Sequence, residues 1–222
     1  MTWLATALLG GCVGLDATSF PQVMISRPVV AGMLTGVLFG RPAEGVALGF
    51  LVEVFALIIL PIGAARYPES GTATVAATAA YLAATPPGLQ AGALLLALVF
   101  ALAWERLAGE TVVLLRRGNG RILTRGGPIG ADALERRHLG AMTLDFLRGG
   151  AMAAVGGVVG YWMLRLLIPV WHLPEHLTLA ALGIAAAGML GTAVALFGAG
   201  RAARTALIGG VVSGVVLVVA LW

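Results

Sequence analysis

The residue in this sequence best placed to do chemistry is Glu53, a carboxylate in the middle of an apolar run. Eight mostly apolar residues precede it from Gly45, and seven apolar residues follow it to Leu60. A carboxylate at that depth in a membrane costs about 2.5–3.5 kcal/mol, so it must face the protein interior or a polar cavity. Two roles follow, a structural pair with Arg27 or a direct ligand for a polar solute, and the residues alone leave both open.

A second polar cluster precedes this run. Asp16, Thr18 and Ser19 suit a helix cap or a break in a helix. Pro21 and Pro28 bracket the residues that follow, which favours a segment at membrane depth that is not a plain transmembrane helix. The cluster is therefore interpreted as the wall of a polar pocket, with an interfacial loop as the alternative.

A third cluster follows the run that contains the buried carboxylate. Pro61 and Gly63 break the helix there, and Tyr67, Glu69 and Ser70 offer a ring face and hydrogen-bonding groups. Aromatic faces and carboxylate acceptors are the mixture that sugars require, although this mixture is a weak sugar signal by itself.

Cysteine and histidine do not point to a metal centre. Cys12, which lies in an apolar run, is the only cysteine, so an internal disulfide is excluded. His172 and His176 are four residues apart, but Pro174 between them argues against one regular helix that would present both. No metal and no cofactor are expected.

Long apolar runs must position these polar clusters. The 222 residues are 59% hydrophobic and 11% charged, against about 25% charged in soluble domains, so lipid is the expected solvent. We predict an all-α, polytopic transmembrane helical bundle. Two of its runs are short enough for broken or re-entrant helices in the N-terminal half, 29–39 and 72–84. The runs are 1–15, 29–39, 45–60, 72–84, 88–103, 149–168, 177–198 and 205–222.

Glycines recur every four residues in the N-terminal half. Gly32, Gly36 and Gly40 form one series, and Gly45 and Gly49 form another. Each series gives a helix a smooth face for close approach to a neighbour. Because this surface exceeds what one short bundle obviously uses, part of it is expected to meet another chain.

The basic residues indicate the orientation of the chain. All of them are arginine, and the segment 111–139 carries six of them against two acids, a difference of +4 that equals the net charge of the whole chain. A basic, Gly-rich loop is expected on the cytoplasmic side, which favours membrane topology over nucleic-acid binding. The expected organisation is a membrane half with the sugar site at 1–110, this basic cytoplasmic loop, and a second membrane half at 140–222.

The order of polar residues resembles subunit IIC of the mannose/fructose/sorbose family of the bacterial phosphoenolpyruvate-dependent sugar phosphotransferase system. The resemblance covers roughly residues 10–80, and residues 138–148 resemble a later family segment weakly. Arg41 and Pro61 depart from the family pattern, so the pattern does not specify which sugar is carried. The residues that carry the resemblance are Asp16, Gln22, Ile25-Ser26-Arg27-Pro28, Gly36 with Gly40, Glu53, Ile62-Gly63-Ala64-Ala65 and Pro68-Glu69.

The resemblance implies a transport subunit of the inner membrane that works within a complex. A IID membrane subunit would be its partner, a IIB protein would phosphorylate the hexose at the cytoplasmic face, and IIA would relay the phosphate. Sugar contacts are carried over to Asp16, Gln22 and Glu53, and with less support to Arg27 and Glu69. No catalytic residue is expected, because the chain has no recognisable phosphate loop or phosphate-accepting histidine.

Two other functions stay open at this point. In an ion- or proton-coupled secondary transporter, Glu53 would be the proton site. In a membrane scaffold that moves nothing, Glu53 and Arg27 would be a structural pair.

Overall fold

The computed structural model describes residues 2–59, 68–124 and 130–196, together with Gly200, Thr205 and Ile208. Every regular element within these residues is helical, which confirms the predicted all-α class. The elements are α1 (Thr2–Thr18), α2 (Pro28–Leu38), α3 (Pro42–Ala56), α4 (Ser70–Ala84), α5 (Ala91–Thr124), α6 (Ala131–Leu167), the short 3-10 helix η1 (Ile168–Val170) and α7 (Glu175–Leu196).

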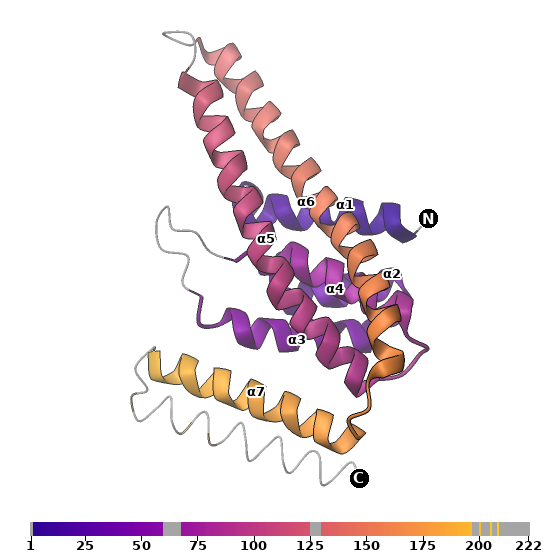
Figure 1. Ribbon diagram of the computed structural model, residues 1–222. Helices are drawn as coiled ribbons and strands as arrows, with labels where there is room; N and C mark the ends of the chain where they lie inside the picture. The colour runs from indigo at the N-terminus through magenta and orange to yellow at the C-terminus, as the bar shows by residue number, and fades with distance from the viewer. Residues whose placement is uncertain are drawn as a thin grey trace.

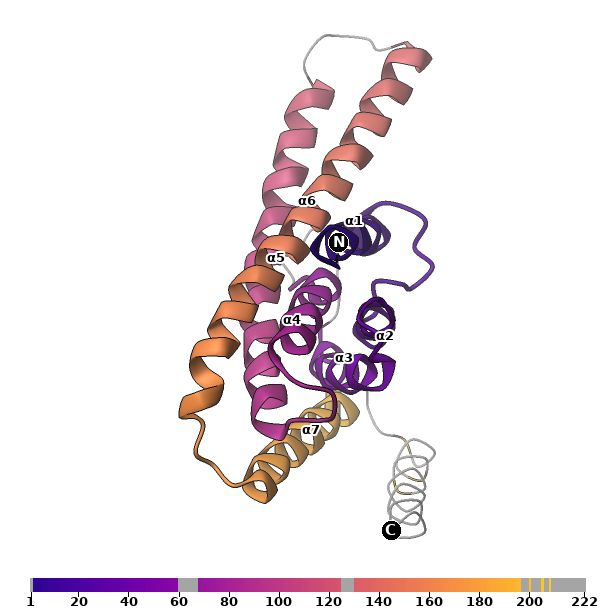
Figure 2. The ribbon, with the colours of Figure 1, turned by 90° about the vertical axis from the view of Figure 1, so that its right-hand side faces the viewer.

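Two directions organise these helices. Helices α1 to α4 lie alongside one another, so that Figure 2 shows all four nearly end-on. Helices α5 and α6 form a long hairpin that crosses them obliquely and projects beyond them, while α7 packs against α3 and α5 (Figure 1). The largest buried apolar cluster lies where α3, α4, α5 and α6 meet, around Leu48, Tyr81, Ala97 and Leu164.

Glycine sets the crossing of α1 over α6. A Cβ placed on Gly14 would lie 2.9 Å from the Cα of Gly149, and one placed on Gly149 would lie 2.6 Å from the carbonyl oxygen of Gly10. The two backbones are therefore in direct contact, which larger side chains would prevent. This contact fixes the end of α1 against the middle of α6.

Helices α2 and α3 form a tight antiparallel hairpin. Each begins with a proline in its first turn, where the missing N–H costs no hydrogen bond. Gly40 makes the turn with a φ of +69°. A Cβ on Gly36 would lie 2.8 Å from the Cα of Pro42, and one on Gly49 would lie 2.5 Å from the carbonyl oxygen of Pro28. The glycine faces thus pack largely against each other inside this chain, although a Cβ on Gly40 would meet nothing within 4 Å. A contact of the remaining surface with another chain stays a prediction.

The α2–α3 hairpin is re-entrant in shape. Eleven residues make α2 about 17 Å long, well short of the roughly 30 Å of a bilayer core. Its two free ends lie together, because Arg27 before α2 contacts Glu53 near the end of α3. This arrangement agrees with the broken or re-entrant helices expected in the N-terminal half.

The segment 111–139, expected as a loop, is helical at residues 111–124 and 131–139. α5 continues to Thr124 and α6 begins at Ala131, so the arginines lie on the projecting hairpin. Gly118 and Gly120 suggested a loop, yet each costs a helix only about 1 kcal/mol, which flanking leucine and arginine with high helix propensity offset. The cytoplasmic placement of this segment stays a prediction. The aromatic ring of Tyr67 and most of the run 205–222 lie outside the described residues.

Three stretches in the described part of the chain are long and apolar enough to cross a membrane, Ala91–Arg121, Ala131–Val170 and Glu175–Leu196. Little of α7 is buried inside the protein, because α3 and α5 cover only one side of it. Large apolar side chains therefore face outward along α7, including Leu177 and Ile184. Such a surface is suited to lipid or to another membrane protein.

Candidate functional site

Asp16 organises the break between α1 and α2. Its side chain is buried, at 2% exposure. Its two carboxylate oxygens accept the backbone N–H groups of Val23, at 2.6 Å, and Ser26, at 2.9 Å. Within the segment that they hold, Gln22 and Met24 take left-handed backbone conformations with φ of 59° and 69°. Non-glycine residues adopt this conformation at a cost, and such residues cluster at functional sites.

The same segment encloses a small hollow of about 200 Å³. Ligand pockets for drug-sized molecules measure about 300–1,000 Å³, so this hollow suits a smaller solute. Three of the predicted sugar contacts are among its lining residues, which are Asp16, Ala17, Gln22, Met24, Ser26 and Arg27.

Glu53 lies next to this hollow without lining it. Its Oε1 is 3.2 Å from Nη1 of Arg27, and its Oε2 accepts the backbone N–H of Val29 at 3.3 Å. Glu53 therefore caps the first turn of α2 from a neighbouring helix. Of its two possible roles, the structural pair is formed, and the ligand role stays a prediction. Arg27 keeps 52% of its side chain exposed, so the pair is open to solvent and to a ligand.

Glu69 is placed apart from the hollow, in a buried ion pair. Nη1 and Nη2 of Arg148 lie 2.5 Å and 2.9 Å from its two oxygens, a two-pronged contact. Such bidentate pairs fix geometry strongly. Glu69 therefore joins the start of α4 to α6, and the structure does not bring it together with the other predicted site residues.

The ion pair continues into a network that the sequence analysis missed. Nε of Arg148 donates to Asp145 at 3.0 Å, and Asp145 accepts the hydroxyl groups of Ser19, at 2.8 Å, and Thr18. The network ties the end of α1 to α6. Asp145 lies three residues before Arg148, so an acid and a base on one helical face were the available signal.

Glu105 is a second buried carboxylate that sequence reasoning missed. Its side chain accepts the hydroxyl of Ser70 at 2.8 Å, and its backbone carbonyl accepts the N–H of Glu69 at 3.0 Å. It thereby holds the start of α4 against α5. Its position just after a long apolar run, 88–103, was the signal in the sequence.

The hollow and the network are neighbours at one end of the α1–α4 group, which we call the Asp16 end. A Cβ on Gly71 would lie 2.6 Å from the carbonyl oxygen of Ser26, and one on Gly14 would lie 3.2 Å from Nη2 of Arg148. This end gathers acceptors, an amide and a guanidinium in one place, which suits a neutral polyhydroxylated solute. Among the described residues, no group of three or more His, Cys, Asp or Glu is arranged to hold a metal ion.

The opposite end of the group, which we call the Arg41 end, carries a different cluster. Arg41 donates to the carbonyl oxygens of Leu82 and Thr85, both at 2.8 Å, and of Pro86, at 2.7 Å. It also pairs with Glu44 at the start of α3. The residue that departs from the family pattern thus closes the C-terminal end of α4.

Comparison with known proteins identifies the family. The sequence model of the PTS system sorbose-specific IIC component matches residues 1–114. A solved "Structure of membrane protein" shares the fold with a TM-score of 0.66 at 19% identity, covering 96% of this chain and 86% of that one. The mannose transporter ManYZ, solved with microcin E492, shares it with a TM-score of 0.53 at 20% identity and the same coverage. No curated protein matches the chain. Because the family match covers more than half of its 222 residues, this chain belongs to the sorbose-specific IIC component family, the membrane subunits of sugar-transporting phosphotransferase systems.

Proposed function

We propose that this chain is the hexose-translocating IIC subunit of a mannose-type phosphotransferase system in the bacterial inner membrane. The observation that carries the proposal is the hollow at the break between α1 and α2, which collects Asp16, Gln22 and Arg27 in one wall. Family membership supplies the class of transported solute. The hollow supplies hydrogen-bonding groups that match sugar hydroxyls, at the break between α1 and α2.

Each polar group of the hollow has a distinct use toward a sugar. Asp16 oxygens each accept one backbone N–H and keep a lone pair for a sugar hydroxyl. The Gln22 amide donates and accepts, and the Arg27 guanidinium donates to hydroxyl oxygens. A site built to hydrogen-bond hydroxyl groups discriminates strongly against solutes that lack them.

The remaining two predicted residues take different places in this proposal. Glu53 is the ligand that becomes available when its contact with the exposed Arg27 side chain opens. Glu69 holds the frame of the site through Arg148.

The proposal includes partner proteins. A IID subunit would complete the membrane complex, and the outward-facing apolar surface of α7 is suited to such a membrane partner as well as to lipid. Soluble IIA and IIB proteins would supply the phosphoryl group, because such chemistry needs groups that this family's membrane subunit is not expected to carry.

Hexose binding to the purified complex with IID tests the sugar site. Asp16→Asn keeps the shape of the side chain and weakens the acceptor, so labelled hexose should bind at least about tenfold less tightly. Asp132→Asn is the matched control, because Asp132 is exposed on the projecting hairpin. Equal hexose binding by both variants, at unchanged melting temperature, would rule out the hollow as the sugar site.

Uptake driven by an ion gradient without a phosphate donor would instead establish a secondary transporter.

Thiol labelling tests the orientation in the membrane. In a Cys12→Ala background, Asn119→Cys on the hairpin should be shielded from an impermeant reagent in intact cells, whereas Glu175→Cys at the start of α7 should react. The reverse pattern would place the Asp16 end outside the cell and contradict release of the sugar to the cytoplasm at this end.

A further inference from the structure

Helix α6 carries one stripe of residues that is only partly covered within the described chain. In its middle, Gly149 and Ala153 face α1, and a Cβ on Gly10 of α1 would lie 3.0 Å from the carbonyl oxygen of Gly149. The same stripe continues toward the hairpin tip through Asp145, Ala141 and the residues before them, at helical spacings of three and four. Helix α1 ends at Thr18, next to Asp145, so the stripe extends past the end of α1.

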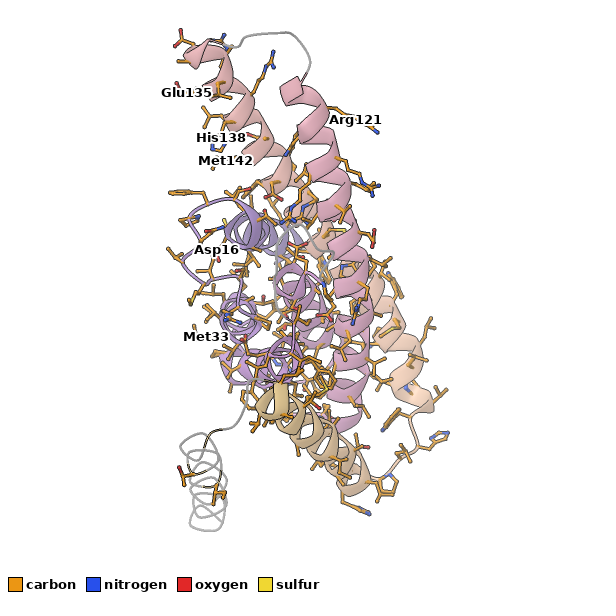
Figure 3. All side chains as sticks on the ribbon, turned by 90° about the vertical axis from the view of Figure 1, so that its left-hand side faces the viewer. Asp16, Met33, Arg121, Glu135, His138 and Met142 are labelled. Atoms are coloured by element: carbon orange, nitrogen blue, oxygen red, sulfur yellow. The ribbon has the colours of Figure 1, made fainter. Side chains whose placement is uncertain are left out.

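A groove of about 710 Å³ lies along this uncovered part of the stripe. Figure 3 shows His138 and Met142 on the side of the hairpin that faces the Asp16 end, with Arg121 on the other side. The groove is lined by Thr18, Ser19, Asn119, Leu134, Arg137, His138, Gly140, Ala141, Met142 and Leu144.

The groove combines exposed apolar side chains with basic ones. Leu134 is 50% exposed and Leu144 is 45% exposed, although both lie in or next to the most arginine-rich segment of the chain. Large apolar side chains that gather on a basic surface mark a protein-binding site more often than a free surface. The six arginines and two acids of residues 111–139 favour an acidic partner.

The polar part of the groove argues against a lipid tail as the occupant. Oδ1 of Asn119 is buried and has no hydrogen-bond partner. Thr18 and Ser19 also line the groove, and their hydroxyl groups donate to Asp145. A hydrocarbon chain would leave the Asn119 oxygen unpaired at a cost in free energy, whereas a protein side chain or backbone N–H can donate to it.

We propose that this groove docks a soluble protein, one that packs aliphatic side chains against Leu134 and Leu144 and lays acidic residues against the arginines of the hairpin. The inference rests on the proposed function, which makes this partner the IIB protein.

The position of the groove fits that partner. Thr18 follows Asp16 by two residues, so the base of the groove adjoins the wall of the sugar hollow. The hydroxyl groups of Thr18 and Ser19 bond to Asp145, which is linked through Arg148 to Glu69 at the start of α4. A protein docked here lies against the end of the bundle where the sugar is held, as phosphorylation of that sugar requires.

The test measures binding of the purified IIB protein from the same genome to the full membrane complex in nanodiscs. Ala141→Trp fills the groove and Leu134→Ser removes an anchor, so each should weaken IIB binding at least about tenfold. Matched controls on the same helix are Thr143→Trp and Leu139→Ser, exposed positions that do not line the groove, which should change binding less than about twofold. Hexose binding should stay unchanged in all four variants.

The outcomes separate the docking surface from the proposed function. If the unchanged complex binds hexose but not IIB, or if the groove variants bind IIB as the controls do, the docking proposal is wrong and the transport proposal stands. The same holds if anionic phosphatidylglycerol vesicles alone protect Asn119→Cys from labelling and IIB does not. A genome that encodes no IIB would contradict both the docking proposal and the proposed phosphotransferase function. If the unchanged complex binds no hexose, the proposed function itself fails.

Discussion

The two ends of the α1–α4 group use the same pair of residue types in opposite ways. At the Arg41 end, the arginine is 12% exposed and donates to Glu44 and to three backbone carbonyl groups. At the Asp16 end, Arg27 is 52% exposed, and its side chain contacts Glu53 at 3.2 Å. One arginine is fixed by many contacts, and the other is held by few.

Helix polarity explains the difference. Arg41 meets the C-terminal end of α4, where orphan carbonyl groups and the negative end of the helix dipole attract a cation. Arg27 stands at the N-terminal end of α2, where N–H groups point outward, so Glu53 takes the backbone contact there and the cation gains little. Both arginines immediately precede a helix, Arg27 before α2 and Arg41 before α3. The difference is that Arg41 also reaches the C-terminal end of another helix, α4, which makes it part of the frame, whereas Arg27 contacts Glu53 and keeps half of its side chain exposed for a ligand.

The largest effect is expected from Arg41→Ala. It leaves Glu44 without its cation and several carbonyl groups without a donor, which should destabilise the protein by about 3–5 kcal/mol. Thermal unfolding of the purified protein in detergent measures this loss. The matched change at the other end, Arg27→Ala, removes a largely exposed pair and should cost about 1 kcal/mol or less. Equal losses at both ends would contradict the distinction between them.

Glu53→Gln should separate binding from stability at the Asp16 end. The amide keeps the size of the side chain and one acceptor, so the N–H of Val29 can keep its partner and the fold should survive. A lost hydrogen bond to a charged group should weaken hexose binding by about 1.5–3 kcal/mol. Calorimetric titration of the complex with hexose measures this loss of binding free energy. Glu135→Gln, at an exposed position on the hairpin, is the control. Unchanged hexose binding would leave Glu53 with the structural pair alone.

The sequence predicted the N-terminal helices and the polar segment that forms the hollow for a local reason. The short apolar run 29–39 and the glycine spacing around Gly36 describe one hairpin, and both signals lie within about thirty residues. Asp16, Gln22 and Arg27 likewise lie on one short segment, so their convergence in one hollow required no knowledge of the remaining chain.

The rest depended on contacts between distant segments. Glu69 pairs with Arg148, 79 residues away, and Asp145 meets Thr18 across 127 residues. No periodicity in the sequence reports such contacts. The projecting hairpin was missed because glycines and arginines resemble a loop locally, whereas the pairing of α5 with α6 favours helix.

Gly36→Leu should affect both ends at once, because Gly36 holds together the hairpin that runs between them. Its added side chain would meet the Cα of Pro42, within 2.8 Å of the first new carbon, and overpacking of this kind costs about 1–3 kcal/mol. Gly183→Leu on α7 is the control, since nothing lies within 4 Å of a Cβ at that position. The melting temperature and the affinity for hexose should both fall for Gly36→Leu, and neither should change for Gly183→Leu. Unchanged thermal unfolding and hexose binding of Gly36→Leu would show that the α2–α3 hairpin separates easily enough to accept the larger side chain.

The smallest effect expected is that of Gln22→Ala, which removes one neutral hydrogen-bonding group from the wall of the hollow. Loss of one such bond should weaken hexose binding by about 0.5–1.5 kcal/mol, roughly two- to tenfold in Kd. Stability should hardly change, because the backbone is held by Asp16 and not by the Gln22 side chain.

Gln90→Ala is the matched control for this last change, an identical substitution beside the Arg41 end, where Gln90 lines a separate hollow of about 170 Å³ with Thr85 and Trp171. If hexose binds at the Asp16 end, Gln90→Ala should leave its Kd unchanged. A loss of binding with Gln90→Ala and none with Gln22→Ala would assign the sugar to the opposite end, because both changes remove the same group and differ only in place. Equal small losses would instead indicate a path that contacts both ends, and Arg41 would then belong to the site as well as to the frame.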